Sequence, residues 1–138
     1  MMALRKRNAA GFTLLELMIV VGIVAILAAL AISGYGFAMV KSRRAAAEGC
    51  LQEAAQSLER YYTTNLTYVG AAAPTCSQSN ITPTFYAIGP AAGEPTATTF
   101  KVQAVPTSKQ NDSRCGTLTI DHKGIKTASG TGGVSACW

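Results

Sequence analysis

Four cysteines, Cys50, Cys76, Cys115 and Cys137, are the residues best suited to chemistry in this chain of 138 residues. No two of them form a Cys-x-x-Cys pair and the chain has a single histidine, so the spacing does not suit a zinc site. Separated cysteines of this kind indicate disulfides, which form in oxidising compartments. The residues by themselves leave three pairings open. We therefore expect an exported, disulfide-bonded protein.

The chain offers no arrangement of residues for catalysis. His122 is the only histidine and lies beside Asp121 in a predicted turn, and no motif places a nucleophile next to it. The glycine-rich stretch at 130–133 lacks the Gly-Lys-Ser/Thr ending of a phosphate-binding loop. We expect a protein that is not an enzyme, with no catalytic residue, cofactor or bound metal.

Basic residues in the C-terminal part of the chain could contact the phosphates of DNA. Five of them form the candidate set: Lys101, Lys109, Arg114, Lys123 and Lys126. The competing interpretation is a dispersed, solvated surface, because the sequence does not say whether the five share a face. The net charge of +5 adds little, since Arg5, Lys6 and Arg7 supply three of the positive charges at the N-terminus.

A carboxylate, Glu16, stands at the start of the longest apolar run. The uncharged residues from Leu17 to Val40 would form a helix roughly 36 Å long, enough to cross a hydrocarbon layer of about 30 Å. A carboxylate at that place costs about 2.5 to 3.5 kcal/mol, so Glu16 calls for a positively charged partner. The alternative is a solvated Glu16 at headgroup depth. The basic cluster before it is typical of a segment retained in the cytoplasm.

The segment from Gly11 to Val21, directly after that basic cluster, resembles the N-terminus of the type IV pilin family. The resemblance implies that a prepilin peptidase cuts between Gly11 and Phe12 and methylates the new amino group of Phe12. It also implies that Glu16 pairs with the amino group of Phe12 in a neighbouring subunit during assembly. The implied partners are this peptidase, the inner membrane and other pilin subunits.

The C-terminal segment from Cys115 to Thr127, followed by Cys137 and Trp138, resembles the terminal loop of type IVa pilins often classed as minor pilins. The resemblance implies that a disulfide between Cys115 and Cys137 closes this loop. Cys50 and Cys76 are then the second pair.

This resemblance implies a structural subunit of an extracytoplasmic type IV pilus, used for twitching motility, adhesion or DNA uptake. The subunit is expected to lie in the inner membrane by a single span before assembly and on the cell surface afterwards, with its head outside the cytoplasm. One alternative is a pseudopilin of a type II secretion system, which the two-cysteine terminal loop argues against. Another is a receptor for DNA or a host surface, displayed on the fibre.

The positioning elements begin with a helix that continues past the apolar run to about Tyr62. An apolar stripe recurs at steps of three and four: Ala47, Leu51, Ala54, Leu58 and Tyr61 or Tyr62. The charged residues are expected mostly on the other faces: Arg43, Arg44, Glu48, Glu53, Glu59 and Arg60. We expect this stripe to pack against a globular layer.

Short strands are predicted after the helix, at Thr84–Ile88 and Thr98–Val105, with a hairpin formed by Thr117–Asp121 and Ile125–Ala128. The stretches 89–96 and 129–135 are predicted to be flexible. The fold class is α+β: a long N-terminal helix on a small antiparallel sheet, as in type IV pilins. The predicted parts are a leader at 1–11, a membrane and filament-core helix at 12–40, and a head at 41–138.

Overall fold

A computed structural model describes residues 11–72, 76 and 83–138 of the chain. The chain forms two units, one ending at Gly36 and the other running from Phe37 to Trp138, and we call the second unit the head. The basic cluster and most of the expected leader lie outside the described residues.

The helix α1 spans Leu14–Asn65 and begins with a side-chain cap. The backbone amide of Glu16 donates to Oγ1 of Thr13 at 3.2 Å, and the Glu16 carboxylate in the first turn interacts favourably with the helix dipole. Within α1, Leu14–Ile32 is long and apolar enough to cross a membrane. We predicted a span from Leu17 to Val40, but its last residues belong to the head, where Val40 is half-buried.

The C-terminal end of α1 lies three residues beyond the predicted Tyr62. Leu66 adopts φ 56°, which stops the helix, and its amide donates to the Tyr62 carbonyl at 2.8 Å. The side-chain amide of Asn65 donates to the Tyr61 carbonyl at 3.0 Å. This side chain gives the Tyr61 carbonyl a second donor in the last turn of α1.

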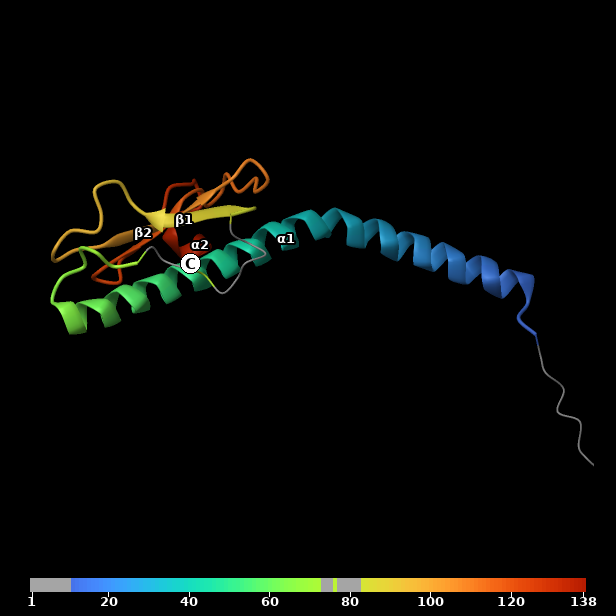
Figure 1. Ribbon diagram of the computed structural model, residues 1–138. Coiled ribbons are helices and arrows are strands. Elements are labelled where there is room, and N and C mark those ends of the chain that lie inside the picture. The colour runs from blue at the N-terminus through green and yellow to red at the C-terminus, as the bar shows by residue number, and fades with distance from the viewer. Residues whose placement is uncertain (1–10, 73–75, 77–82) are drawn as a thin grey trace, which may run out of the picture. The chain divides into compact units, whose positions relative to one another are not determined.

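Four antiparallel strands form the sheet in the order β1-β2-β3-β4. Their bounds are β1 Tyr86–Pro90, β2 Lys101–Pro106, β3 Leu118–Asp121 and β4 Lys126–Ala128, and a short helix α2 follows at Val134–Cys137. Within the head, the sheet lies along the second half of α1 (Figure 1). The predicted long helix on a small antiparallel sheet is confirmed.

Two strand boundaries were predicted too early, at Thr84 and Thr98. The threonines before β2 belong instead to a loop organised by Glu94, whose carboxylate accepts from the Thr96 amide at 3.2 Å and from Oγ1 of Thr99 at 3.1 Å. Threonine is β-branched and therefore favours strands. Here the threonines instead form hydrogen bonds within a loop, through their hydroxyls and backbone amides. The stretch from Gly89 to Thr96, predicted as flexible, therefore contributes to β1 and to this hydrogen-bonded loop.

The second stretch predicted as flexible, 129–135, is held by backbone hydrogen bonds. The amides of Gly130 and Gly132 donate to the carbonyls of Cys115 and Arg114 at 2.9 and 2.7 Å, and α2 follows. A side chain at position 130 would collide with the Arg114 backbone, so glycine is required for this approach. The many glycines here permit close packing of two backbone segments.

Both disulfides join segments that are distant in sequence. Cys115 is bonded to Cys137 with 5.5 Å between Cα atoms, and Cys50 is bonded to Cys76 with 5.1 Å. The disulfide-closed C-terminal loop implied by the resemblance is confirmed.

The core of the head lies between α1 and the inner face of the sheet. From α1 it contains Ala47, Leu51, Ala54 and Leu58, and from the rest of the head mainly Tyr68, Tyr86, Phe100, Val102, Leu118 and Ile120. The predicted helical stripe is therefore the buried one.

Arg44 was expected mostly among the solvent-facing charges, and this expectation is wrong. It stands three residues before Ala47 on the core stripe, is 6% exposed, and donates from Nη1 to both carboxylate oxygens of Asp112 at 3.1 Å. Asp112 also accepts from the Tyr86 hydroxyl at 3.0 Å and from the Cys115 amide at 3.3 Å. Burial raises the pKa of Tyr86 above its ordinary value.

Replacing Arg44 by Met should destabilise the head by about 3 to 5 kcal/mol, because the Asp112 carboxylate would remain buried without its cation. Urea unfolding of the oxidised fragment 37–138 measures this loss. Arg43→Met is the matched control: the Arg43 guanidinium lies 3.7 Å from the Phe85 ring centre and should contribute about 1 kcal/mol or less. Equal losses for the two variants would contradict a special role for the buried pair.

Candidate functional site

The residues expected at the processing site precede α1. Gly11 and Phe12 lie outside the helix, Phe12 is 81% exposed, and Glu16 is in the first helical turn. The peptide bond between Gly11 and Phe12 is thus outside regular structure, as a peptidase requires.

The five basic residues expected to contact DNA fall at two ends of the sheet. Lys109 and Arg114 are in the connection between β2 and β3, whereas Lys101 begins β2 and pairs in register with Asp121 at the end of β3. Lys123 follows in the β3–β4 turn. Because β2 and β3 are antiparallel, the connection and the turn lie at opposite ends, so the set does not form one patch.

Lys126 is held against the C-terminal residue. Its ammonium lies 4.6 Å from the ring centre of Trp138, and the Trp138 indole donates to the Thr127 carbonyl at 3.0 Å. Lys126 is also paired in register with Ile120, a core residue. This lysine therefore lies on the edge strand of the sheet, and its ammonium group interacts with the Trp138 ring.

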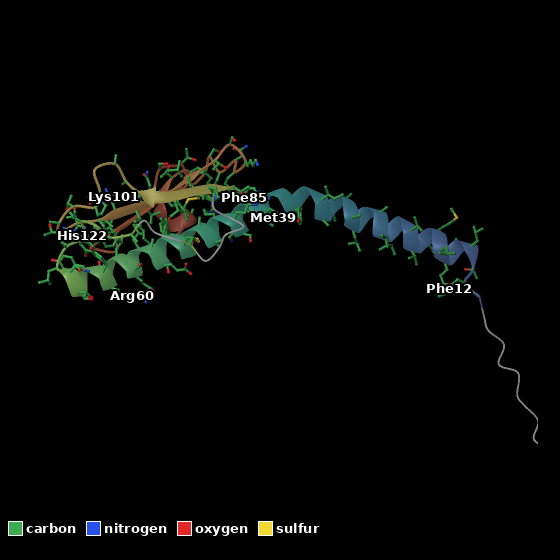
Figure 2. The ribbon with its side chains drawn as sticks, in the orientation of Figure 1. Phe12, Met39, Arg60, Phe85, Lys101 and His122 are labelled. Atoms are coloured by element: carbon green, nitrogen blue, oxygen red, sulfur yellow. A yellow bond between two sulfur atoms is a disulfide. The ribbon has the colours of Figure 1, made fainter. Side chains whose placement is uncertain are left out.

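Arg60 joins Lys101 at the end of the head where α1 finishes. Figure 2 shows Arg60, Lys101 and His122 at this end, away from Met39 and Phe85. Lys123 is the next residue after His122. We call Arg60, Lys101 and Lys123 the distal cations. The sequence placed Arg60 on an exposed helix face, but nothing in its spacing connected that face with Lys101.

An open groove of about 400 Å³ lies beside Arg60 and Lys123, between α1 and the β3–β4 turn. Its lining residues are Ala55, Gln56, Glu59, Arg60, Phe100, Ile120, Asp121, His122 and Gly124. The His122 amide donates to the Phe100 carbonyl at 3.0 Å, and the two rings meet edge to face with their centres 6.4 Å apart. The groove thus has an apolar floor and an aromatic side wall.

Two carboxylates face this groove and have different roles. Oδ1 of Asp121 accepts from the amides of Lys123 and Ile125, both at 2.9 Å, and so fixes the turn. Oε1 of Glu59 accepts from the Tyr68 hydroxyl at 3.1 Å. Burial, followed by this bond to Glu59, raises the pKa of Tyr68 to about 12.

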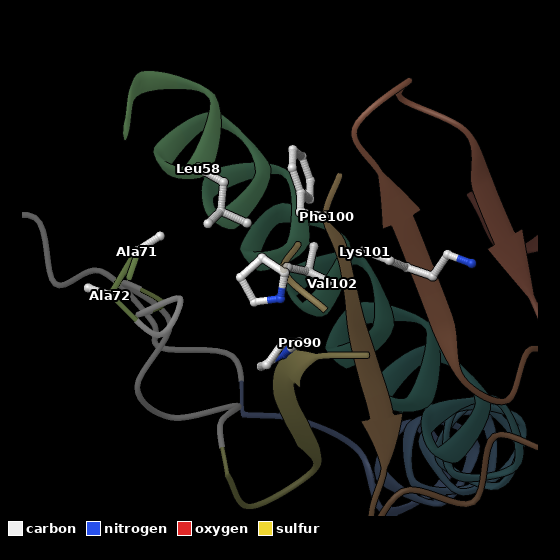
Figure 3. A pocket seen from close by; sticks show the side chains of 8 residues that line it. Leu58, Ala71, Ala72, Pro90, Phe100, Lys101 and Val102 are labelled. Atoms are coloured by element: carbon white, nitrogen blue, oxygen red, sulfur yellow. The ribbon is translucent and has the colours of Figure 1, made fainter. Parts of the chain in front are cut away.

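A second cavity, of about 170 Å³, also borders Phe100 (Figure 3). Its walls are Leu58, Ala71, Ala72, Pro90, Pro95, Phe100, Lys101 and Val102. Among the described residues that line it, Lys101 is the only charged one and none is a carboxylate. The groove at the β3–β4 turn is larger and carries the polar groups that a ligand needs for orientation, so it is the stronger candidate.

Within residues 11–72, 76 and 83–138, no group of three histidine, cysteine, aspartate or glutamate side chains could hold a metal ion.

Two family models match the chain. The model described as type IV minor pilin ComP, DNA uptake sequence receptor, matches residues 33–119, which is more than half of the chain. The prokaryotic N-terminal methylation motif matches residues 6–32. No curated protein sequence matches the chain.

Two solved structures share the fold. A type IV pilin from Shewanella oneidensis is 31% identical, with a TM-score of 0.55, over 72% of this chain and 97% of that one. The non-core minor pilin PilV of Neisseria meningitidis is 23% identical, with a TM-score of 0.52, over 68% and 90%. The second likeness concerns the fold alone.

Proposed function

Because the chain belongs to the type IV minor pilin ComP family, we propose that its head is a DNA receptor carried on a type IV pilus. The chain is a structural pilus subunit with an apolar N-terminal helix and a disulfide-bonded head. Its partners in the fibre are other pilin subunits. Before assembly the helix anchors it in the inner membrane, and afterwards the head is presented outside the cell.

The observation that carries the receptor proposal is that the distal cations share one end of the head. Arg60, Lys101 and Lys123 come from α1, β2 and the β3–β4 turn, and all three are exposed. Exposed cations on three rigid elements at one end can replace counterions along a phosphate backbone.

Processing is proposed to occur between Gly11 and Phe12, with methylation of the Phe12 amino group. This cut removes the basic cluster and keeps the apolar helix. Intact mass of the protein from sheared fibres should correspond to a methylated chain beginning at Phe12. A mature chain that begins after Ala31 would contradict the proposal, because it would lack the anchor.

Replacing Glu16 by Gln should preserve membrane insertion but deplete the subunit from fibres. In the bilayer the change removes an unfavourable carboxylate. In a packed filament it would leave the amino group of a neighbouring Phe12 buried without its partner, at a cost of roughly 3 to 5 kcal/mol. Quantifying the protein in membranes and in sheared fibres measures both effects.

The control for this experiment is Glu16→Asp, which keeps the charge and should be incorporated better than Glu16→Gln. Undiminished incorporation of Glu16→Gln would mean that Glu16 is only a solvated residue at headgroup depth.

DNA binding by the full chain in detergent should be weak and strongly salt-dependent. Three phosphate contacts predict a loss of affinity of about 40-fold between roughly 50 and 200 mM salt. Lys123→Ala or Arg60→Ala should reduce the slope of log affinity against log salt by about 0.9. Fluorescence anisotropy with a labelled duplex gives these values.

Lys109→Ala is the matched control, because Lys109 lies at the opposite end of the strands and should leave the slope unchanged. If Lys109→Ala lowers the slope as much as Lys123→Ala, the distal cations are not the contact site.

A further inference from the structure

Charged side chains of both signs surround the groove. The guanidinium of Arg60 and the carboxylates of Glu59 and Asp121 all line it. Lys123 lies in the β3–β4 turn beside it, and Arg60 and Lys123 are both exposed. A phosphate at the groove would be attracted by these two cations, whereas the carboxylates can accept hydrogen bonds from a neutral group.

This combination of groups suits a nucleotide. Its phosphate is anionic, whereas its base is neutral and flat and bears N–H donors on its edge. We propose that the groove holds an unpaired DNA base while Arg60 and Lys123 hold the adjoining phosphates. The inference rests on the proposed receptor function and adds a single-stranded element to the DNA that the head recognises.

The walls of the groove suit stacking. The imidazole of His122 is fixed by its edge-to-face contact with Phe100 and by its backbone hydrogen bond to the same residue. The planar guanidinium of Arg60 lines the same groove, and its Nε is directed to the Gln56 carbonyl at 3.3 Å. Aromatic rings and guanidinium planes are the surfaces on which unpaired bases stack. A volume of about 400 Å³ is within the range of small-molecule sites.

The carboxylates favour bases that carry an amino group. Asp121 is committed to the turn through two amides, so Glu59 is the acceptor that can turn to a ligand while it keeps its bond to Tyr68. A carboxylate accepts well from the amino group of cytosine, whereas thymine presents a carbonyl at that position. The groove should therefore prefer cytosine to thymine.

The test uses the full chain in detergent and three labelled DNA hairpins: blunt, with a short oligo-dC overhang, and with a short oligo-dT overhang. Wild type should bind the dC probe about tenfold more tightly than the blunt probe, a gain typical of one stacked base. The dT probe should fall between the two. Binding of the blunt probe at low salt reports the receptor function separately.

The variants separate stacking, base reading and charge. His122→Ala should abolish the advantage of both overhangs, and Glu59→Gln should abolish only the preference for dC over dT. Lys123→Ala should weaken binding to all three probes by the same factor. Glu53→Gln is the control, since it removes a carboxylate of α1 that does not line the groove.

Equal affinity of wild type for the blunt and overhang probes would overturn the base-binding groove and leave the receptor function intact. A preference for dC that survives in Glu59→Gln would overturn the role of this carboxylate in base reading. Failure to bind any probe at low salt would overturn both proposals.

Discussion

The guanidinium of Arg44 is buried in the head where α1, the β2–β3 connection and the C-terminal disulfide meet. Its Nη1 binds Asp112 and also contacts the sulfur of Cys115. Asp112 accepts from Tyr86 on β1 as well, so one carboxylate joins α1, β1 and the β2–β3 connection, three segments that are distant in sequence. A buried charge pair of this kind adds little net stability, but each partner is costly to remove. It therefore determines which residues of the connection must face the helix.

That arrangement fixes one end of the head and leaves the other to ligands. The disulfide between Cys115 and Cys137 and the bonds of Gly130 and Gly132 close the end near Arg44. At the opposite end the main constraints are local, namely the turn around Asp121 and the aromatic contacts of Phe100. A rigid frame with locally organised loops at one end is a common way to support a binding site.

The distribution of the cations also explains why net charge is a poor guide to where this protein would bind DNA. Lys126 is turned to Trp138, and Lys109 and Arg114 lie at the other end of the strands. Only Lys101 and Lys123 of the original five remain at the proposed site, together with Arg60. What matters for a nucleotide is the local combination of cations and carboxylates at the groove, because attraction between charges weakens within about 10 Å in physiological salt.

The sequence by itself determined the apolar helix, the position of Glu16, the stripe from Ala47 to Leu58 and the hairpin around His122. These features depend on short-range periodicity and on a local motif. The tertiary structure decided the burial of Arg44, because its partner Asp112 is 68 residues away and no helical period reveals it. It also decided which cations share an end, since strand register and the length of α1 place Arg60 and Lys101 at the same end of the head. Pairings across such distances depend on how the chain closes its core, which local patterns do not encode.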